Sequence, residues 1–141
     1  MNTLIRVQGW VSDSAIIKPD ERFTDPSQLH SIRIQPADPN IYKELEYSIE
    51  ELKRISETPD NNQHSYEHED AVIDGSEIIF KSFYKPQLFG DFEHIQGDDE
   101  LLGKYVQAVG HLKIFKDGNV FLSVHILEPA IYDQFDPLEN T

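Results

Sequence analysis

Two lysines flank a phenylalanine along one predicted strand. Lys81, Phe83 and Lys85 share one parity of residues 76–85, so an extended chain places them on a single face. Ammonium groups neutralise phosphates and aromatic rings stack on bases, so this spacing is typical of a groove that holds a single-stranded nucleic acid. Half-exposed sheet surfaces that bind nothing carry the same residue types, and both interpretations stay open here.

The C-terminal third of the chain carries a second mixed face. Tyr105, Lys113 and Phe115 occupy one parity of a predicted strand whose other parity is aliphatic. Residues 116–119 follow, and their Asp-Gly step is typical of a tight hairpin turn. A second alternating run begins at Val120. The sequence therefore predicts a long antiparallel hairpin with one aliphatic face and one face of aromatic, histidine and lysine side chains.

The N-terminal part adds cations and the only tryptophan. Arg6 and Trp10 share one parity of the first predicted strand, and Arg33 holds the outward parity of the second. Lys18 lies at the end of an extended continuation of the first strand. Trp10 can serve in binding, or it can simply cover the edge of a core.

The net charge of -14 opposes binding to phosphates. An acidic chain is repelled by nucleic acid unless its cations gather on one face, because phosphate binding depends on local cation placement. Six of the twelve lysines and arginines fall on one predicted face or its rim: Arg6, Lys18, Arg33, Lys81, Lys85 and Lys113. The alternative is that the acidic surface itself functions, as a protein-interaction module or as a DNA mimic that inhibits a nucleic-acid enzyme.

Residues for other chemistries are missing or poorly placed. The chain has no cysteine, which excludes disulfides, thiolate catalysis and thiolate-ligated zinc. No nucleophile elbow or phosphate loop is present, and the paired carboxylates Asp98 and Asp99 fall in a predicted loop. Residues whose side chains can bind a metal are concentrated in one aperiodic segment, at His64, Glu67, His68 and Asp70. Because no further ligands lie at structured positions, we expect no metal, no cofactor and no enzymatic activity.

The expected location is a reducing cytoplasm, that of the host if the protein is viral. No apolar run approaches the roughly 20 residues that a membrane-crossing helix needs. The N-terminal residues lack the charged and then apolar layout of a signal peptide. The absence of cysteine agrees with this setting.

The apolar pattern of residues 39–57 predicts a helix, the only one expected from the sequence. Its apolar residues recur at spacings of four, four, three and three and therefore form one stripe. They are Ile41, Leu45, Ile49, Leu52 and Ile55. Asp38 can cap the helix, and Pro39 at the first helical position loses no needed hydrogen bond. We expect this amphipathic helix to plug or cover a sheet.

The element order predicts a mainly β protein. Strands are predicted over residues 4–12, 29–35, 76–85, 104–115 and 120–127, and residues 15–18 continue the first in extended form. Because strands and helices do not alternate, a small antiparallel barrel is favoured. Among such barrels the five-stranded oligonucleotide-binding (OB) fold suits the length and strand number, with the helix as an insertion. We expect one domain over residues 1–130 and a loosely held acidic C-terminal tail over residues 131–141.

The order of several short motifs carries a family resemblance over about residues 4–130. These motifs are Ala15-Ile16-Ile17-Lys18-Pro19, the strand 30–35 with Asp38-Pro39, Asp74-Gly75, Lys81-Ser82-Phe83-Tyr84-Lys85-Pro86, and Gly103-Lys104-Tyr105-Val106. Their layout resembles that of the tailed-phage single-stranded DNA-binding proteins, the acidic helix-destabilising proteins of phage replication, which have an OB-fold. The tail here is short and ends without the aromatic residue of well-studied members, and the helix comes earlier than in the commonest OB order.

The resemblance implies sequence-tolerant binding of single-stranded DNA during phage-type replication, recombination or repair. The implied groove residues are Arg6, Trp10, Lys18, Arg33, Lys81, Phe83, Lys85, Tyr105, Lys113 and Phe115. Replication proteins are the implied partners of the acidic surface or tail. Both a monomer and a homodimer agree with the sequence, because an open barrel leaves edge strands that can pair.

Overall fold

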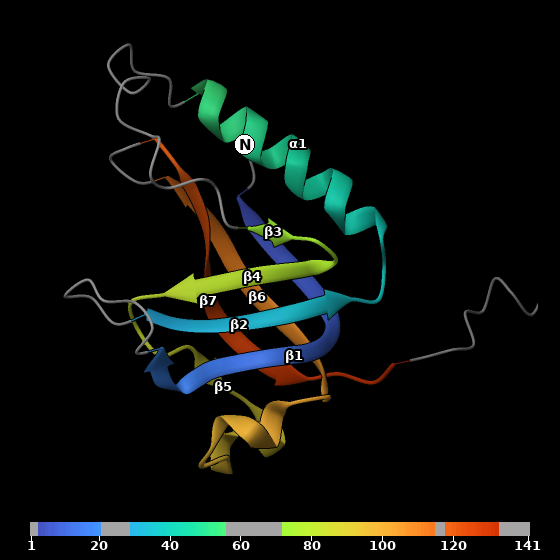
Figure 1. Ribbon diagram of the computed structural model, residues 1–141, viewed down its shortest axis with the longest axis vertical. Helices are drawn as coiled ribbons and strands as arrows, with labels where there is room; N and C mark the ends of the chain where they lie inside the picture. The colour runs from blue at the N-terminus through green and yellow to red at the C-terminus, as the bar shows by residue number, and fades with distance from the viewer. Residues whose placement is uncertain (1–2, 21–28, 56–71, 115–117, 133–141) are drawn as a thin grey trace, which may run out of the picture.

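The computed structural model describes residues 3–20, 29–55, 72–114 and 118–132 (Figure 1). Its strands are β1 (Leu4–Asp20), β2 (Leu29–Pro36), β3 (Ile73–Asp74), β4 (Glu77–Ser82), β5 (Gln87–Leu88), β6 (Tyr105–Ile114) and β7 (Val120–Pro129). The helices are α1 (Asn40–Ile55) and two 3₁₀ helices, η2 (Gly90–His94) and η3 (Asp98–Leu101). The predicted strands and the predicted helix are therefore all present, while β3, β5, η2 and η3 were not predicted.

Five strands close into a barrel. The sheet order is β3-β4-β2-β1-β6-β7-β5, and a further pairing of β4 with β7 closes the ring of β1, β2, β4, β6 and β7. The β4–β7 and β5–β7 pairs are parallel, whereas the other pairs are antiparallel. The prediction of an entirely antiparallel barrel is therefore wrong. A ring with an odd number of strands cannot reverse direction at every pair, so one pair must run parallel.

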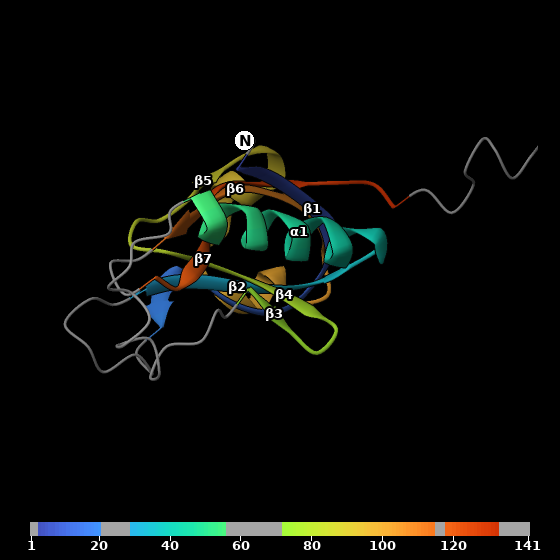
Figure 2. The same ribbon diagram turned by 90° about the horizontal axis from the view of Figure 1, so that it is seen from above.

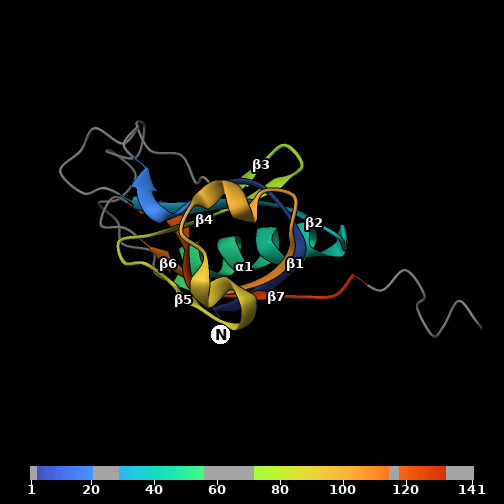
Figure 3. The same cartoon turned by 90° about the horizontal axis from the view of Figure 1, so that it is seen from below.

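Helices cover the two ends of the barrel. Figures 2 and 3 view the ring from opposite sides, with α1 across one end and η2 and η3 at the other. Leu45 of α1 is fully buried, and Ile49 packs against the core from a partly buried position. The Asp38 carboxylate accepts a hydrogen bond from the Asn40 N–H (3.0 Å), as its capping role requires. Ile55 is 59% exposed, so the apolar stripe ends one turn earlier than predicted.

β1 is one long, bent strand rather than a strand and a separate extension. Its register against β2 shifts between Val11 and Asp13, which leaves Ser12 as an extra residue. Such a bulge bends a strand and increases its twist. The first half of β1 can therefore pair with β6 while the second half pairs with β2.

β4 ends earlier than predicted. Its last residue is Ser82, so Phe83 and Lys85 follow the strand instead of lying on it. The Ser82 hydroxyl accepts a hydrogen bond from the Tyr84 N–H (3.2 Å), and such local bonds compete with the pairing of a strand. The prediction of a strand to residue 85 is therefore wrong, and the aromatic and basic side chains after Ser82 lie on a turn.

Candidate nucleic-acid interface

The seam where β4 meets β7 gathers cations and aromatic rings on the outside of the barrel. Lys81 pairs with Ser123 of β7, and Ser123 pairs with His111 of β6, so one row crosses three strands. In the next row, Lys113 pairs with Phe121. We call the side chains around this seam the closure patch, which consists of Lys81, Phe83, His111, Lys113, Phe121 and His125.

An aromatic pair lies in the closure patch. The rings of Phe83 and Phe121 meet edge to face, with centroids 6.4 Å apart. Phe83 is 45% exposed, and the neighbouring Tyr84 is 83% exposed. Large apolar side chains usually bury more of their surface than this. The patch therefore presents ring surface to which a flat ligand such as a base can stack.

Two histidines extend the patch along the hairpin. The rings of His111 and His125 lie edge to face with centroids 4.9 Å apart. Partial burial lowers the pKa of His125, and the positive charges of His111 and Lys113 lower it further. His125 therefore lies close enough to His111 and Lys113 for their charges to add to the effect of burial.

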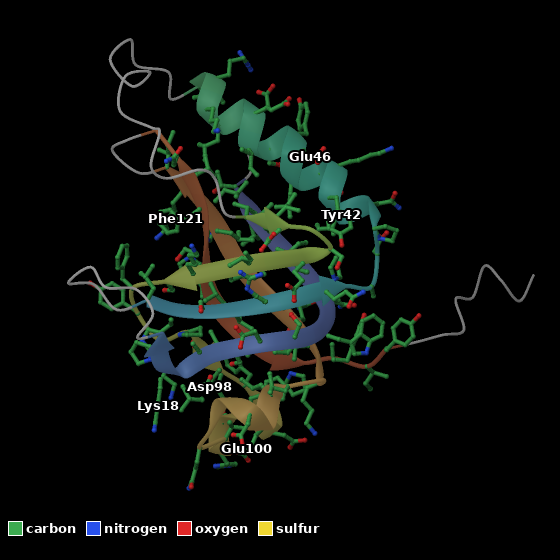
Figure 4. All side chains as sticks on the ribbon, in the orientation of Figure 1. Lys18, Tyr42, Glu46, Asp98, Glu100 and Phe121 are labelled. Carbon is green, nitrogen blue, oxygen red and sulfur yellow. The ribbon has the colours of Figure 1, made fainter. Side chains whose placement is uncertain are left out.

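Further exposed lysines lie on the same side of the molecule. Figure 4 shows Lys18, at the exposed end of β1, on the side of the barrel that also carries Phe121. Lys85 is exposed just beyond β4. On this side β1 and β4 end and β2 begins (Figure 1). In OB-folds, ligands bind to the face of the second and third barrel strands and to adjacent loops, and these strands are β2 and β4 here.

Arg33 is held by carboxylates of its own chain. Its Nη1 atom lies 3.0 Å from Oδ2 of Asp74 and 3.1 Å from Oε1 of Glu77. The hydrogen bond that Arg33 donates to Asp74 raises the pKa of Arg33, although partial burial opposes this shift. The Ser12 hydroxyl donates to the same Glu77. Because two carboxylates already oppose its charge, Arg33 attracts a phosphate less than its place in the sequence implies.

Trp10 and Tyr105 belong to a second aromatic cluster. The Trp10 ring centroid lies 5.1 Å from that of Tyr105 and 4.9 Å from that of Tyr132, and the two tyrosine rings are 5.3 Å apart. Partial burial raises the pKa of Tyr105, with a smaller contribution from Tyr132. The Tyr105 hydroxyl donates to Oε1 of Gln8 (3.3 Å).

This second cluster is separate from the closure patch. Trp10 pairs with Gln35 near one end of β2. Lys81 pairs with Ser31 of the same strand, and the four residue-to-residue steps from Ser31 to Gln35 span about 13 Å in an extended chain. The structure therefore divides the predicted groove residues into two groups and does not bring Trp10 together with Lys81.

The remaining predicted site residues lie as follows. Arg6 is exposed on β1, opposite Val109 of β6, between the two groups. Phe115 lies outside the described residues, and so do the four residues considered as metal ligands, His64, Glu67, His68 and Asp70.

Among the residues that the structure does describe, no three histidine or acidic side chains gather as metal ligands. The described helices include none that is long and apolar enough to cross a membrane.

Three residues of the closure patch were not named from the sequence as site residues: His111, Phe121 and His125. The alternation of the C-terminal hairpin places all three on the mixed face, and that is the available signal. From the sequence, Asp98 is only one of two paired carboxylates in a predicted loop. It accepts hydrogen bonds from the N–H groups of Ile16 (2.6 Å) and Ile17 (2.9 Å), so its role is to hold β1.

Solved structures similar to this chain share its OB-like fold. The single-stranded DNA-binding protein of bacteriophage Enc34, in a C-terminally truncated form, superposes with a TM-score of 0.64 at 14% identity and covers 94% of this chain and 87% of that chain. The same phage protein in complex with single-stranded DNA gives a TM-score of 0.61 at 15% identity, covering 94% and 88%. No family model and no curated protein matches the chain. At this identity the comparison establishes the fold.

Proposed function

We propose that the chain binds single-stranded DNA across the closure patch, without reading its base sequence. The observation that carries the proposal is the Phe83–Phe121 pair at the seam, where Lys113 lies opposite Phe121 on the neighbouring strand. Stacking surface beside cations is the arrangement that binds single strands, because every base has a flat face and every nucleotide a phosphate. The bound DNA in one of the similar structures supports the proposal.

The patch favours a single strand over a duplex. Lys85 and Lys113 would each neutralise a phosphate, while bases stack on Phe83 and Phe121. In a duplex the bases are stacked on one another and cannot reach the rings. The acidic remainder of the chain, with its net charge of -14, also repels the denser charge of a duplex.

The competing hypothesis of a DNA mimic or acidic interaction module makes a different prediction. A mimic needs regularly spaced carboxylates and no basic face. Exposed carboxylates do occur on α1, at Glu44, Glu46 and Glu50. The clustered cations of the closure patch favour DNA binding over mimicry, with the acids of α1 left for protein partners.

The proposed setting is phage-type DNA replication, recombination or repair in the host cytoplasm. In this setting the chain protects a transient single strand and contacts replication proteins through its acidic surface or tail. It acts as a binding protein and not as an enzyme, in line with the DNA-binding proteins that share its fold.

Fluorescence anisotropy of a labelled oligonucleotide tests the proposal. We expect the single strand to bind, the matched duplex to bind much more weakly, and affinity to fall with added salt. Replacing both Lys85 and Lys113 by alanine should weaken binding, whereas a double Lys43→Ala and Lys104→Ala variant removes the same charge at exposed sites outside the patch. Absence of single-strand binding at low salt, or equal loss in both double variants, would refute this interface.

Trp10 is a poor reporter for this site because it lies in the second aromatic cluster. A Phe121→Trp variant places an indole within the closure patch and leaves Trp10 as an internal reference. We expect the new indole to be quenched when single-stranded DNA is added, because bases stacked on indoles quench their fluorescence. Quenching of Trp10 alone, compared in the parent protein, would instead place the DNA on the second aromatic cluster.

A further inference from the structure

A bulge in β7 brings two imidazoles together on the outer face of the hairpin. The β6–β7 register shifts between Val109 and Gly110, and His125 is the extra residue on β7. Gly110 permits this close approach, since a Cβ there would overlap the carbonyl oxygen of Ser123. Bulges re-aim side chains and are frequent next to functional sites. Here the bulge leaves His125 exposed, with its ring 4.9 Å from that of His111.

The charged groups around this histidine pair are almost all basic. Among the described residues they are Lys113 from β6, Lys81 from β4 and Arg6 from β1. The one acid of β7 is Glu128, and its carboxylate already accepts a hydrogen bond from Gln107 (2.6 Å). Among the described residues no carboxylate forms an ion pair with either imidazole. The pair therefore lies in a field that favours an anion.

Without an anion, this field opposes protonation. Partial burial lowers the pKa of His125 below the ordinary 6.5, and the charges of His111 and Lys113 act in the same direction. A phosphodiester against the ring would act in the opposite direction, because a nearby negative charge favours the imidazolium form. Binding of phosphate and binding of protons at this place must then strengthen each other.

We propose that His111 and His125 form a phosphate site at which binding of single-stranded DNA takes up protons. The site rests on the DNA-binding function proposed above and deepens it. At high pH the imidazoles are neutral, and only the lysines attract the phosphates of the DNA. At lower pH the imidazolium groups add hydrogen-bond donors and positive charge. The strand would therefore be held more tightly as the pH falls through the range in which histidine titrates.

The histidine resonances of the protein provide the direct test. In an NMR titration, the pKa of His125 should rise when a saturating dT oligonucleotide is present. If the bound phosphate raises the pKa of one histidine by about one unit, the dissociation constant at low pH should be about tenfold below that at high pH. This measurement uses the unaltered protein, so it does not depend on the folding of a variant.

Variants separate the histidine pair from the general effect of acid on an acidic protein. A double His111→Gln and His125→Gln variant should lose the extra pH dependence, measured over pH values at which circular dichroism shows both proteins folded. His94→Gln is the matched control, because His94 is exposed in η2 at another part of the molecule. The control should keep the pH dependence of the parent protein.

The two proposals fail in different ways. Salt-sensitive single-strand binding with the same pH profile in parent and double variant would overturn the histidine site and leave the DNA-binding function standing. An unchanged pKa of His125 in the presence of bound oligonucleotide would do the same. No binding at low salt and low pH would overturn the DNA-binding function itself.

Discussion

At the scale of single residues, the partner of a cation decides what the cation can do. Arg33 and Lys113 both lie on outward positions of barrel strands. Arg33 contacts Asp74 and Glu77, whereas Lys113 lies among histidines and a phenylalanine. Counterions leave DNA when a protein cation neutralises a phosphate. A cation that is already paired with carboxylates of its own chain contributes little to this release. The two residues should therefore contribute differently to binding.

The salt dependence of binding separates these two cations. Lys113→Ala should reduce the slope of log affinity against log salt by about 0.7, the value for one phosphate contact in a single strand. Arg33→Ala should change this slope much less, and should instead lower stability by exposing two carboxylates to each other. Anisotropy titrations at several salt concentrations give the slopes. A larger change for Arg33 than for Lys113 would place the DNA on the face of β2.

His125 also makes folding depend on pH. Its pKa in the folded protein lies below the ordinary 6.5, so the native state binds fewer protons than the unfolded state as the pH falls. The contribution to stability is present above about pH 6.5 and is lost as the pH falls through the lowered pKa. Urea unfolding at a series of pH values should show this loss in the parent protein and less of it in His125→Gln. Equal profiles would show that the histidine is not perturbed.

At the scale of elements, one carboxylate joins η3 to β1. Asp98 accepts hydrogen bonds from the Ser14 hydroxyl (2.7 Å) and from three consecutive N–H groups, those of Ile16, Ile17 and Lys18. Hydrogen bonds to a charged acceptor are stronger than those between neutral groups. This contact fixes the direction of the last part of β1, where Lys18 is exposed (Figure 4).

Removing this carboxylate should loosen the end of β1. We expect Asp98→Ala to lower the free energy of unfolding by roughly 2 to 3 kcal/mol, because it leaves three N–H groups without their charged acceptor. Asp98→Asn should cost less, since an amide oxygen can still accept. Asp99→Ala, at an exposed neighbouring position, is the control. Urea unfolding measures all three, and equal effects of Asp98→Ala and Asp99→Ala would refute the role.

The positions of the strands could largely be predicted from the sequence, but which strands pair with one another could not. Alternation along 104–115 and 120–127 predicted β6 and β7 because one face of each strand is aliphatic and buried. Parity, however, tells which face a residue occupies and not which strand lies beside it. The pairing of β4 with β7 and the ion pairs of Arg33 join residues about 40 positions apart. For the same reason parity predicts that Trp10 and Lys81 line one groove, without showing that they lie in separate clusters of side chains.

At the scale of the whole molecule, a strongly acidic chain keeps one basic area. The net charge is -14, yet the closure patch and its rim hold Lys18, Lys81, Lys85 and Lys113. Exposed acids lie on α1, across one end of the barrel (Figure 2). An acidic majority limits non-specific adhesion, and under the proposed function the basic area would direct a negatively charged strand to one side of the molecule.

The parallel seam that closes the barrel has a consequence for folding. It joins Lys81 to Ser123, a long-range contact whose loop-closure entropy must be met before the contact forms. The antiparallel hairpin of β6 and β7 can form locally, but the Phe83–Phe121 pair exists only after the ring has closed. If the chain binds DNA at the closure patch as proposed, only the closed barrel presents the complete site. An incompletely folded chain would then not compete for the strand, and a bound strand would stabilise the β4–β7 junction.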